Sequence, residues 1–171
     1  MPTIALLNGH AFAGGLMLAM YHDYRIFNGT RGFLCLNELD FGVPLNPAMS
    51  SIFRQKLPSP MTYRSMVLES HRFSGPEALA ASIVDGLGGI EEVHALVKDK
   101  KLDTRAKSGV YGNMKAEMYR ETLGYLEEKE KPGQTVGGMT DIRFKEMERK
   151  KESKAKVREW ERNTKGGIAK L

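Results

Sequence analysis

The segment between Thr3 and Met20 constrains the fold of this chain more than any other part of the sequence. Thr3 to Leu7 is a short apolar run, Gly9 interrupts it, and Gly14-Gly15 precedes the apolar residues Leu16 to Met20. This order predicts a strand, a glycine-rich turn and the start of a helix. Glycines let a ligand approach the backbone closely, and the free N–H groups at a helix start attract negative charge.

A single carboxylate follows in the next apolar stretch. Gly32 to Leu36 predicts a further strand, and Glu38 comes shortly after it. A backbone N–H donor beside a lone carboxylate is the minimal set of groups for moving a proton next to a carbonyl. Spacing alone leaves ordinary alternatives open, because Gly14-Gly15 also fits a plain tight turn and Glu38 also fits a surface or capping glutamate.

Composition bounds the class of protein. With 171 residues the chain can bury one hydrophobic core. Its net charge of +5 belongs to the C-terminal part, since residues 1–127 carry 13 basic and 13 acidic residues and residues 128–171 carry 13 and 8. We therefore expect no nucleic-acid-binding surface on the folded part.

No apolar run reaches the length of a membrane span, so we expect no stable membrane insertion. Cys35 is the only cysteine, which suits a reducing compartment.

Strand and helix signals alternate through the first 90 residues. Residues 24–27 and 83–86 predict strands. Asn46-Pro47 has the form of an N-cap followed by proline at the first helical position. Ser74 and Glu77 have the spacing of a capping box at the start of another helix. The pattern predicts an α/β fold for residues 1–90.

The C-terminal part of the chain reads as helical. Residues 91–97 and 111–126 predict helices, the second with an apolar face of Met114, Met118, Leu123 and Leu126. Glycine and proline between Lys131 and Gly138 predict a linker. Residues 141–161 predict a charged helix that is either solvated or docked along a narrow seam. We thus expect three parts: residues 1–90 as a core, 91–130 as a helical region, and 131–171 as linker, charged helix and tail.

The sequence Asn8-Gly-His-Ala-Phe-Ala-Gly-Gly-Leu-Met-Leu-Ala-Met20 resembles the glycine turn and helix of the crotonase (enoyl-CoA hydratase/isomerase) superfamily. The following stretch Arg31 to Asp40 resembles the peroxisomal delta-3,delta-2-enoyl-CoA isomerases of fungi and plants. The resemblance covers about the first two-thirds of the chain. It implies a truncated crotonase-like ββα spiral with C-terminal helices, in which the N-terminal half of the fold is missing.

The resemblance also assigns roles to residues. Glu38 is implied as the general base and acid that moves a proton of a 3-enoyl thioester from C2 to C4, and the Gly14 N–H as an oxyanion donor. Ala11, Phe12 and Ala13 are implied to line the thioester channel. Hydratases of the family have a second glutamate where this chain has Met17, so the resemblance favours isomerisation over hydration. No cofactor is expected beyond the coenzyme A of the substrate, and no metal site is expected because the histidines lack partners at ligand spacing.

Location and partners follow from the C-terminus and the resemblance. Ala169-Lys170-Leu171 resembles the Ser-Lys-Leu address that a peroxisomal import receptor reads. The family implies an acyl-CoA substrate and a homo-oligomer, a trimer by resemblance. A second hypothesis is a truncated, catalytically inactive crotonase-like chain that acts at most as an oligomer partner, because an open sheet edge would invite association.

Overall fold

The computed structural model describes residues 1–127 and 139–168, with the side chains of the last helix described from 144 to 164. Two compact units divide the chain, Met1–Glu128 and Lys129–Leu171. The elements of the first unit, in chain order, are β1 (Ile4–Leu7), β2 (Ala11–Phe12), α1 (Gly14–Tyr21), β3 (Tyr24–Phe27), β4 (Leu34–Cys35), α2 (Pro47–Lys56), α3 (Pro60–Leu68), α4 (Gly75–Ala80), β5 (Gly86–Leu87), α5 (Ile90–Asp99), α6 (Leu102–Arg105), α7 (Tyr111–Met118) and α8 (Arg120–Glu127).

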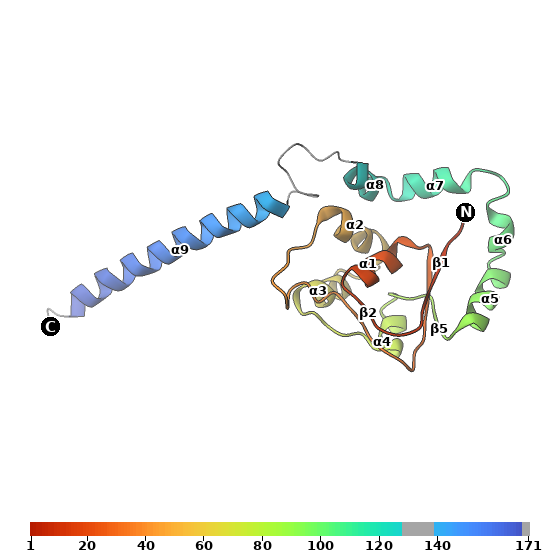
Figure 1. Ribbon diagram of the computed structural model, residues 1–171, viewed down its shortest axis with the longest axis horizontal. Coiled ribbons are helices and arrows are strands. Elements are labelled where there is room, and N and C mark those ends of the chain that lie inside the picture. The colour runs from red at the N-terminus through yellow and green to blue at the C-terminus, as the bar shows by residue number, and fades with distance from the viewer. Residues whose placement is uncertain (128–138, 169–171) are drawn as a thin grey trace. The chain divides into compact units, whose positions relative to one another are not determined.

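The strands form two small parallel sheets. One has the order β1-β3-β5, with Ile4 opposite Tyr24 and Ile26 opposite Gly86. The other pairs β2 with β4. In Figure 1, α1 lies between the strands and α2, while α5 to α8 follow one another around the outside of the unit. Parallel strands joined by helices are the α/β architecture that the sequence predicts.

Local capping signals act as predicted. The Asn46 side chain accepts the Ala48 N–H at 2.8 Å, and Pro47 is the first residue of α2. At α4, the Glu77 carboxylate accepts the backbone N–H of Ser74 at 2.8 Å and its hydroxyl at 2.6 Å. The helix starts at 47 and 75 are therefore confirmed, each with its first backbone donors satisfied by a side chain.

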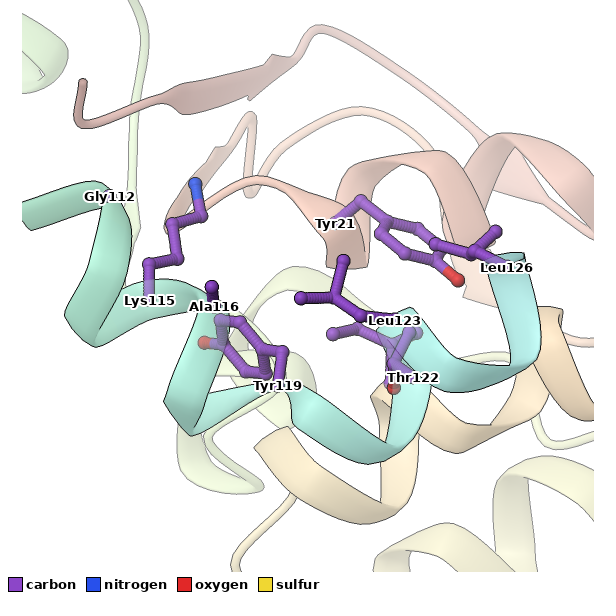
Figure 2. A pocket seen from close by; sticks show the side chains of 9 residues that line it. Tyr21, Gly112, Lys115, Ala116, Tyr119, Thr122, Leu123 and Leu126 are labelled. Carbon is purple, nitrogen blue, oxygen red and sulfur yellow. The ribbon is translucent and has the colours of Figure 1, made fainter. Parts of the chain in front are cut away.

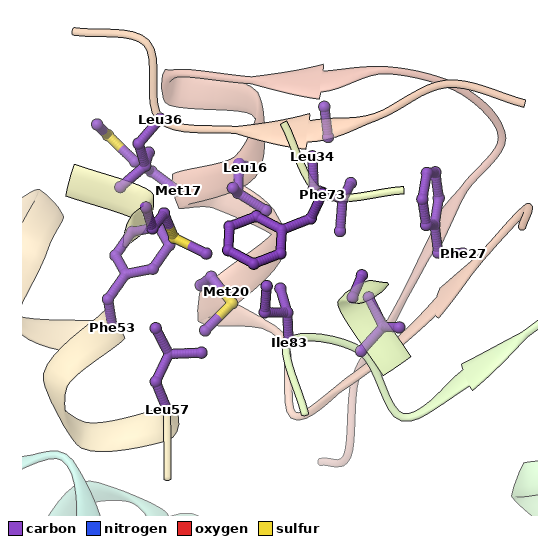
Figure 3. Close-up of a cluster of buried hydrophobic side chains, with 14 of the residues drawn as sticks. Leu16, Met17, Met20, Phe27, Leu34, Leu36, Phe53, Leu57, Phe73 and Ile83 are labelled. Carbon is purple, nitrogen blue, oxygen red and sulfur yellow. The ribbon is translucent and has the colours of Figure 1, made fainter. Parts of the chain in front are cut away.

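The core lies between α1, α2, α3 and the strands. Leu16, Met20, Phe27 and Phe53 have no measurable exposure or close to none. Figure 3 shows the ring of Phe73 surrounded by Leu16, Leu34 and Met20. Met17 is also in this cluster, which confirms that it packs in the core. The buried face of α1 thereby fixes the helix against the strands.

An ion pair between the buried Arg25 and the partly exposed Asp85 joins β3 to the turn before β5. The Arg25 guanidinium donates to the Ile83 carbonyl at 2.7 Å and lies 3.1 Å from the Asp85 carboxylate. The same carboxylate accepts the backbone N–H of Arg25 at 2.7 Å. Burial lowers the pKa of Arg25, and the charge of Asp85 opposes this.

Two predictions in this unit are wrong. Residues 111–126 form two helices rather than one, and Met114 and Met118 are more than half exposed instead of forming an apolar face. Thr122 is buried in their place, because its hydroxyl donates to Gln55 at 2.6 Å and lies 2.8 Å from that of Ser51. The strand predicted at 83–86 is confined to β5 (Gly86–Leu87), since the residues before it turn around the Arg25 side chain.

The second unit contains α9 (Met139–Ile168). The charged helix predicted at 141–161 is confirmed, and Phe144 and Trp160 on it are exposed. The predicted linker at Lys131 to Gly138 and the predicted address Ala169-Lys170-Leu171 lie outside the described residues. Within the part of the chain that the structure describes, no helix combines the length and apolar character needed to cross a membrane.

Candidate functional site

The pairing of β2 with β4 brings Gly14 and Glu38 to the same end of a sheet. Phe12 is opposite Cys35, and the Ala13 N–H continues the ladder by donating to the Cys35 carbonyl at 2.9 Å. Because the strands are parallel, the chain leaves both of them at the same end of the sheet. Gly14 follows β2 there, and Glu38 follows β4. The short β2 itself was not predicted.

The start of α1 is open to a ligand. Gly14 and Gly15 are exposed, and a Cβ built on either residue would meet no heavy atom within 4 Å. The Met17 N–H donates to the Ala13 carbonyl at 3.0 Å, so the N–H groups of Gly14 and Gly15 come before the start of the helical ladder. The helix start predicted at Gly14-Gly15 is confirmed.

Ala13, the residue before the helix, has an unusual backbone. Its φ is 48° and its ψ is −126°, a region that residues with a Cβ rarely adopt. The conformation turns the chain from β2 into α1 within one residue. The backbone is therefore strained at the point that aims the Gly14 N–H.

Glu38 is held by a compact turn. Its carbonyl accepts the N–H groups of Phe41 at 3.2 Å and Val43 at 2.9 Å. The side chain is half-buried, and among the described residues its Oε2 atom has no hydrogen-bond partner although it is shielded from solvent. Burial raises the pKa of Glu38, which a backbone hydrogen bond only partly offsets. A carboxyl group with a raised pKa and a free oxygen is suited to accept and return a proton.

An apolar pocket of about 170 Å³ contains Glu38 in its wall. The other lining residues are aliphatic side chains or proline: Leu36, Leu39, Val43, Pro44, Leu45, Val67 and Leu68. The low polarity of this lining explains why the charged form of the Glu38 carboxyl is disfavoured. Sequence analysis identified Glu38 but missed Leu45 and Val67, because their approach to Glu38 depends on how the loop before α2 and α3 pack.

The structure places the remaining predicted site residues beside this edge. Ala11 is buried, while Phe12 and Ala13 are half-buried. The Phe12 ring lies under the Arg72 guanidinium, 5.8 Å from its centroid, and meets the His10 ring edge-on at 5.2 Å. In the described residues, 1–127 and 139–168, no three potential metal-ligating side chains converge on one site.

A second apolar pocket, of about 250 Å³, lies at the other end of α1. Figure 2 shows Tyr21 of α1 facing Leu123 and Leu126 of α8 across it, with Lys115 of α7 nearby. Lys115 is paired with Asp23 at 2.8 Å, and the Tyr21 hydroxyl donates to the Ala48 carbonyl. Neither Gly14 nor Glu38 lines this pocket, so it is separate from the candidate site.

Comparison with known proteins identifies the family of the chain. The family described as enoyl-CoA hydratase/isomerase matches residues 1–122. The chain belongs to this family. It is 36% identical over 131 residues to the peroxisomal enoyl-CoA delta isomerase 2 of Arabidopsis thaliana, covering 74% of this chain and 55% of that protein. It is 34% identical over 126 residues to enoyl-CoA delta isomerase 3 of the same plant, covering 71% and 53%.

Solved structures of the enoyl-CoA hydratase/isomerase family show the same fold. The enoyl-CoA hydratase EchA3 of Mycobacterium ulcerans superposes with a TM-score of 0.61 at 22% identity, over 72% of this chain and 54% of that one. EchA3 of Mycobacterium marinum gives the same values. The predicted crotonase-like fold is thus confirmed. The chain spans about half the length of the relatives it matches.

Proposed function

We propose that the chain isomerises 3-enoyl-CoA to trans-2-enoyl-CoA in fatty-acid β-oxidation, with Glu38 as the single proton shuttle. The observation that carries this proposal is the half-buried Glu38 carboxylate, one oxygen of which has no hydrogen-bond partner within residues 1–127 and 139–168, at the end of the sheet where α1 begins. Identity to proteins named enoyl-CoA delta isomerases supports the choice of reaction.

The proposed mechanism needs two groups of this chain. Glu38 removes a proton from C2 of the thioester, and the electron pair moves into an enolate whose negative charge rests on the thioester oxygen. The Gly14 N–H stabilises that oxygen, and one such donor is worth roughly 3 kcal/mol. The enolate then re-forms the carbonyl, the double bond moves to C2–C3, and C4 takes the proton back from Glu38. Atoms and charge balance without a cofactor beyond the coenzyme A of the substrate.

The residue at position 17 supports isomerisation against hydration. Adding water needs one group to activate it and another to manage the second proton. Met17 is 5% exposed within the core and has no acid-base chemistry, so it offers no second carboxylate near Gly14. A lone carboxylate is sufficient for a proton that leaves and returns to the same substrate.

The test is Glu38→Gln assayed with 3-decenoyl-CoA. We expect kcat to fall by about a thousandfold, because the amide cannot accept the C2 proton, while substrate affinity stays within about threefold. Formation of the conjugated 2-enoyl thioester is followed by ultraviolet absorbance. The matched control is Asp40→Asn, which removes an exposed carboxylate two residues away. Equal turnover in Glu38→Gln and the unsubstituted chain would remove Glu38 from the mechanism.

A second candidate follows from the coverage of the relatives. The chain spans about half their length, and the alternative function is that of a catalytically inactive crotonase-like chain that associates with other subunits. Absence of turnover by the unsubstituted chain, together with co-elution with a full-length family member, would favour this candidate. Turnover by the unsubstituted chain would exclude it.

We further propose a peroxisomal location and a homo-oligomer, a trimer by family resemblance. Two relatives carry peroxisomal in their names, and Ala169-Lys170-Leu171 resembles the address read by the import receptor. Fusion of the C-terminal segment to a fluorescent protein tests the location. Import that persists after Leu171 is deleted would contradict this role of the tripeptide.

A further inference from the structure

The helix α9 gathers part of its positive charge on one face. It is a single continuous helix (Figure 1), and basic and acidic residues are mixed along its sequence. At about 3.6 residues per turn, however, positions 151, 154, 158 and 162 fall within about 80° of arc. We call these four residues the basic stripe: Lys151, Lys154, Arg158 and Arg162. All four are exposed.

The acidic residues of α9 flank the basic stripe and do not neutralise it. By the helical repeat, Glu148, Glu152 and Glu159 lie along one side of it. On the far side, Glu146 lies 3.0 Å from Arg149 and 4.0 Å from Lys150, two cations outside the stripe. Among the described residues, no carboxylate lies within ion-pair distance of a member of the stripe.

Such a stripe is unfavourable for the helix by itself. Lys154, Arg158 and Arg162 follow one another at intervals of four residues, the spacing at which side chains are neighbours on a helix. Like charges at this spacing destabilise a helix. An anionic partner that lies along this face would relieve the repulsion.

The flanking residues favour a narrow partner over a flat one. A membrane surface covers a wide arc of a helix that lies on it, so its anionic headgroups would also meet the flanking glutamates. Membrane-surface helices also carry their apolar residues on one face. On α9 the exposed side chains of Phe144 and Trp160 point in directions about 160° apart, so one surface cannot receive both.

A single strand of nucleic acid fits the dimensions of the basic stripe. From Lys151 to Arg162 the stripe is about 16 Å long at 1.5 Å per residue, and one strand with a phosphate about every 3.4 Å places about five phosphates along it. Phe144, which is 60% exposed, lies on the same face of the helix before the stripe begins. Exposed aromatic rings beside a row of cations are the groups on which unpaired bases stack.

We propose that the basic stripe of α9 binds the phosphate backbone of single-stranded nucleic acid. The proposal is independent of the isomerase proposal, because the family match ends at residue 122. It also concerns a part of the chain outside residues 1–127, whose charges are balanced.

The test measures binding of the full chain to a fluorescein-labelled oligouridine of about 15 nucleotides by fluorescence anisotropy. With four phosphate contacts, the slope of log K against log salt between about 50 and 200 mM should be about −3. Lys151→Gln combined with Lys154→Gln should bring the slope to about −1.5 and weaken binding at about 100 mM salt at least about tenfold. Far-ultraviolet circular dichroism checks that both variants used here keep the helix.

The matched control is Arg149→Gln combined with Lys150→Gln, which removes the same charge from neighbouring positions outside the stripe. Its affinity should stay within about twofold of the unsubstituted chain, since it keeps the phosphate contacts. Equal weakening in the two double variants would show that net charge acts without the stripe, and would overturn the proposal. So would a lack of binding by the unsubstituted chain at about 50 mM salt, binding to phosphatidylserine vesicles without binding to oligouridine, or equally tight binding to polyglutamate.

Discussion

Glu38 is poorly solvated for a charged residue, and its surroundings account for this. One carboxylate oxygen is shielded from solvent without a partner among the described residues, and the pocket around it is aliphatic. Burial raises its pKa above the ordinary value of 4.5. Folding therefore disfavours the ionised form of Glu38, the residue proposed to act as the base.

This has a consequence for stability against pH. Because the pKa is higher in the folded chain, the folded carboxyl takes up its proton at a higher pH than the unfolded one. The ionised Glu38 carboxylate destabilises the folded chain in full above the pKa of the folded state. This destabilisation disappears as the pH falls towards the pKa of the unfolded state. We expect Glu38→Gln to be more stable than the unsubstituted chain at neutral pH, and the difference to shrink as pH falls towards 4.5. Urea unfolding of both proteins across this range measures it, and a less stable Gln variant at neutral pH would contradict it.

Ala13 offers a second prediction at the residue scale. Its φ of 48° and ψ of −126° suit glycine, and such a conformation costs a residue with a Cβ about 1–3 kcal/mol. Ala13→Gly removes this strain but adds entropy to the unfolded chain, which offsets about 0.4–1 kcal/mol. We expect a net gain of about 1 kcal/mol in the free energy of unfolding. Ala11→Gly, in β2, is the control and should lose stability; a loss in Ala13→Gly of similar size would show that Ala13 is unstrained.

At the scale of elements, the Arg25–Asp85 pair is the main polar link between β3 and the chain leading into β5. Asp85→Ala leaves the Arg25 guanidinium, whose side chain is 6% exposed, without its charged partner. Because Asp85 is partly exposed and Arg25 keeps its bonds to the Ile83 and His22 carbonyls, we expect the loss typical of a hydrogen bond to a charged group, about 1.5–3 kcal/mol. Thermal or urea unfolding measures this. In the double variant Arg25→Met with Asp85→Ala, the loss of stability should be smaller than the sum of the losses in the two single variants, since the unpaired charge is gone. Strict additivity would show that the two side chains are not coupled.

The helices and strands also show which features of the fold could be predicted from the sequence. The helix starts at Gly14, Pro47 and Gly75 were predictable because each depends on residues within one turn of the chain. The strand β2 was not, because Ala11 and Phe12 become a strand only by pairing with residues 34 and 35. The burial of Thr122 depends in the same way on hydrogen bonds to Ser51 and Gln55, which come from another helix.

In the candidate site, too, features set by local sequence could be predicted and features set by tertiary packing could not. Gly14 and Glu38 could be selected from a local pattern and a resemblance, because each is a chemical group at a recognisable position in the sequence. Leu45 and Val67 carry no such mark, since aliphatic residues occur throughout the chain. They join the pocket only because α3 and the loop before α2 pack beside the turn that holds Glu38.

At the scale of the whole molecule, the charge is unevenly divided. Residues 1–127 are balanced at 13 basic and 13 acidic residues, and the net charge of +5 comes from residues 128–171. The match to the enoyl-CoA hydratase/isomerase family covers residues 1–122, so the family fold and the positive charge belong to different parts of the chain. Any contact with acidic partners should therefore depend on the second part and weaken as salt rises.

The packing of α1 has a consequence for the proposed reaction. Leu16, Met17, Ala19 and Met20 anchor this helix in the core, each 5% exposed or less, and Gly14 is its first residue. The peptide dipoles at that end cannot reorient without disturbing the core. A substrate arriving there would meet a field already aligned with the charge it must develop, whereas water would first have to turn its own dipoles. The free energy of that alignment is supplied once, when the chain folds, and not again in each catalytic cycle.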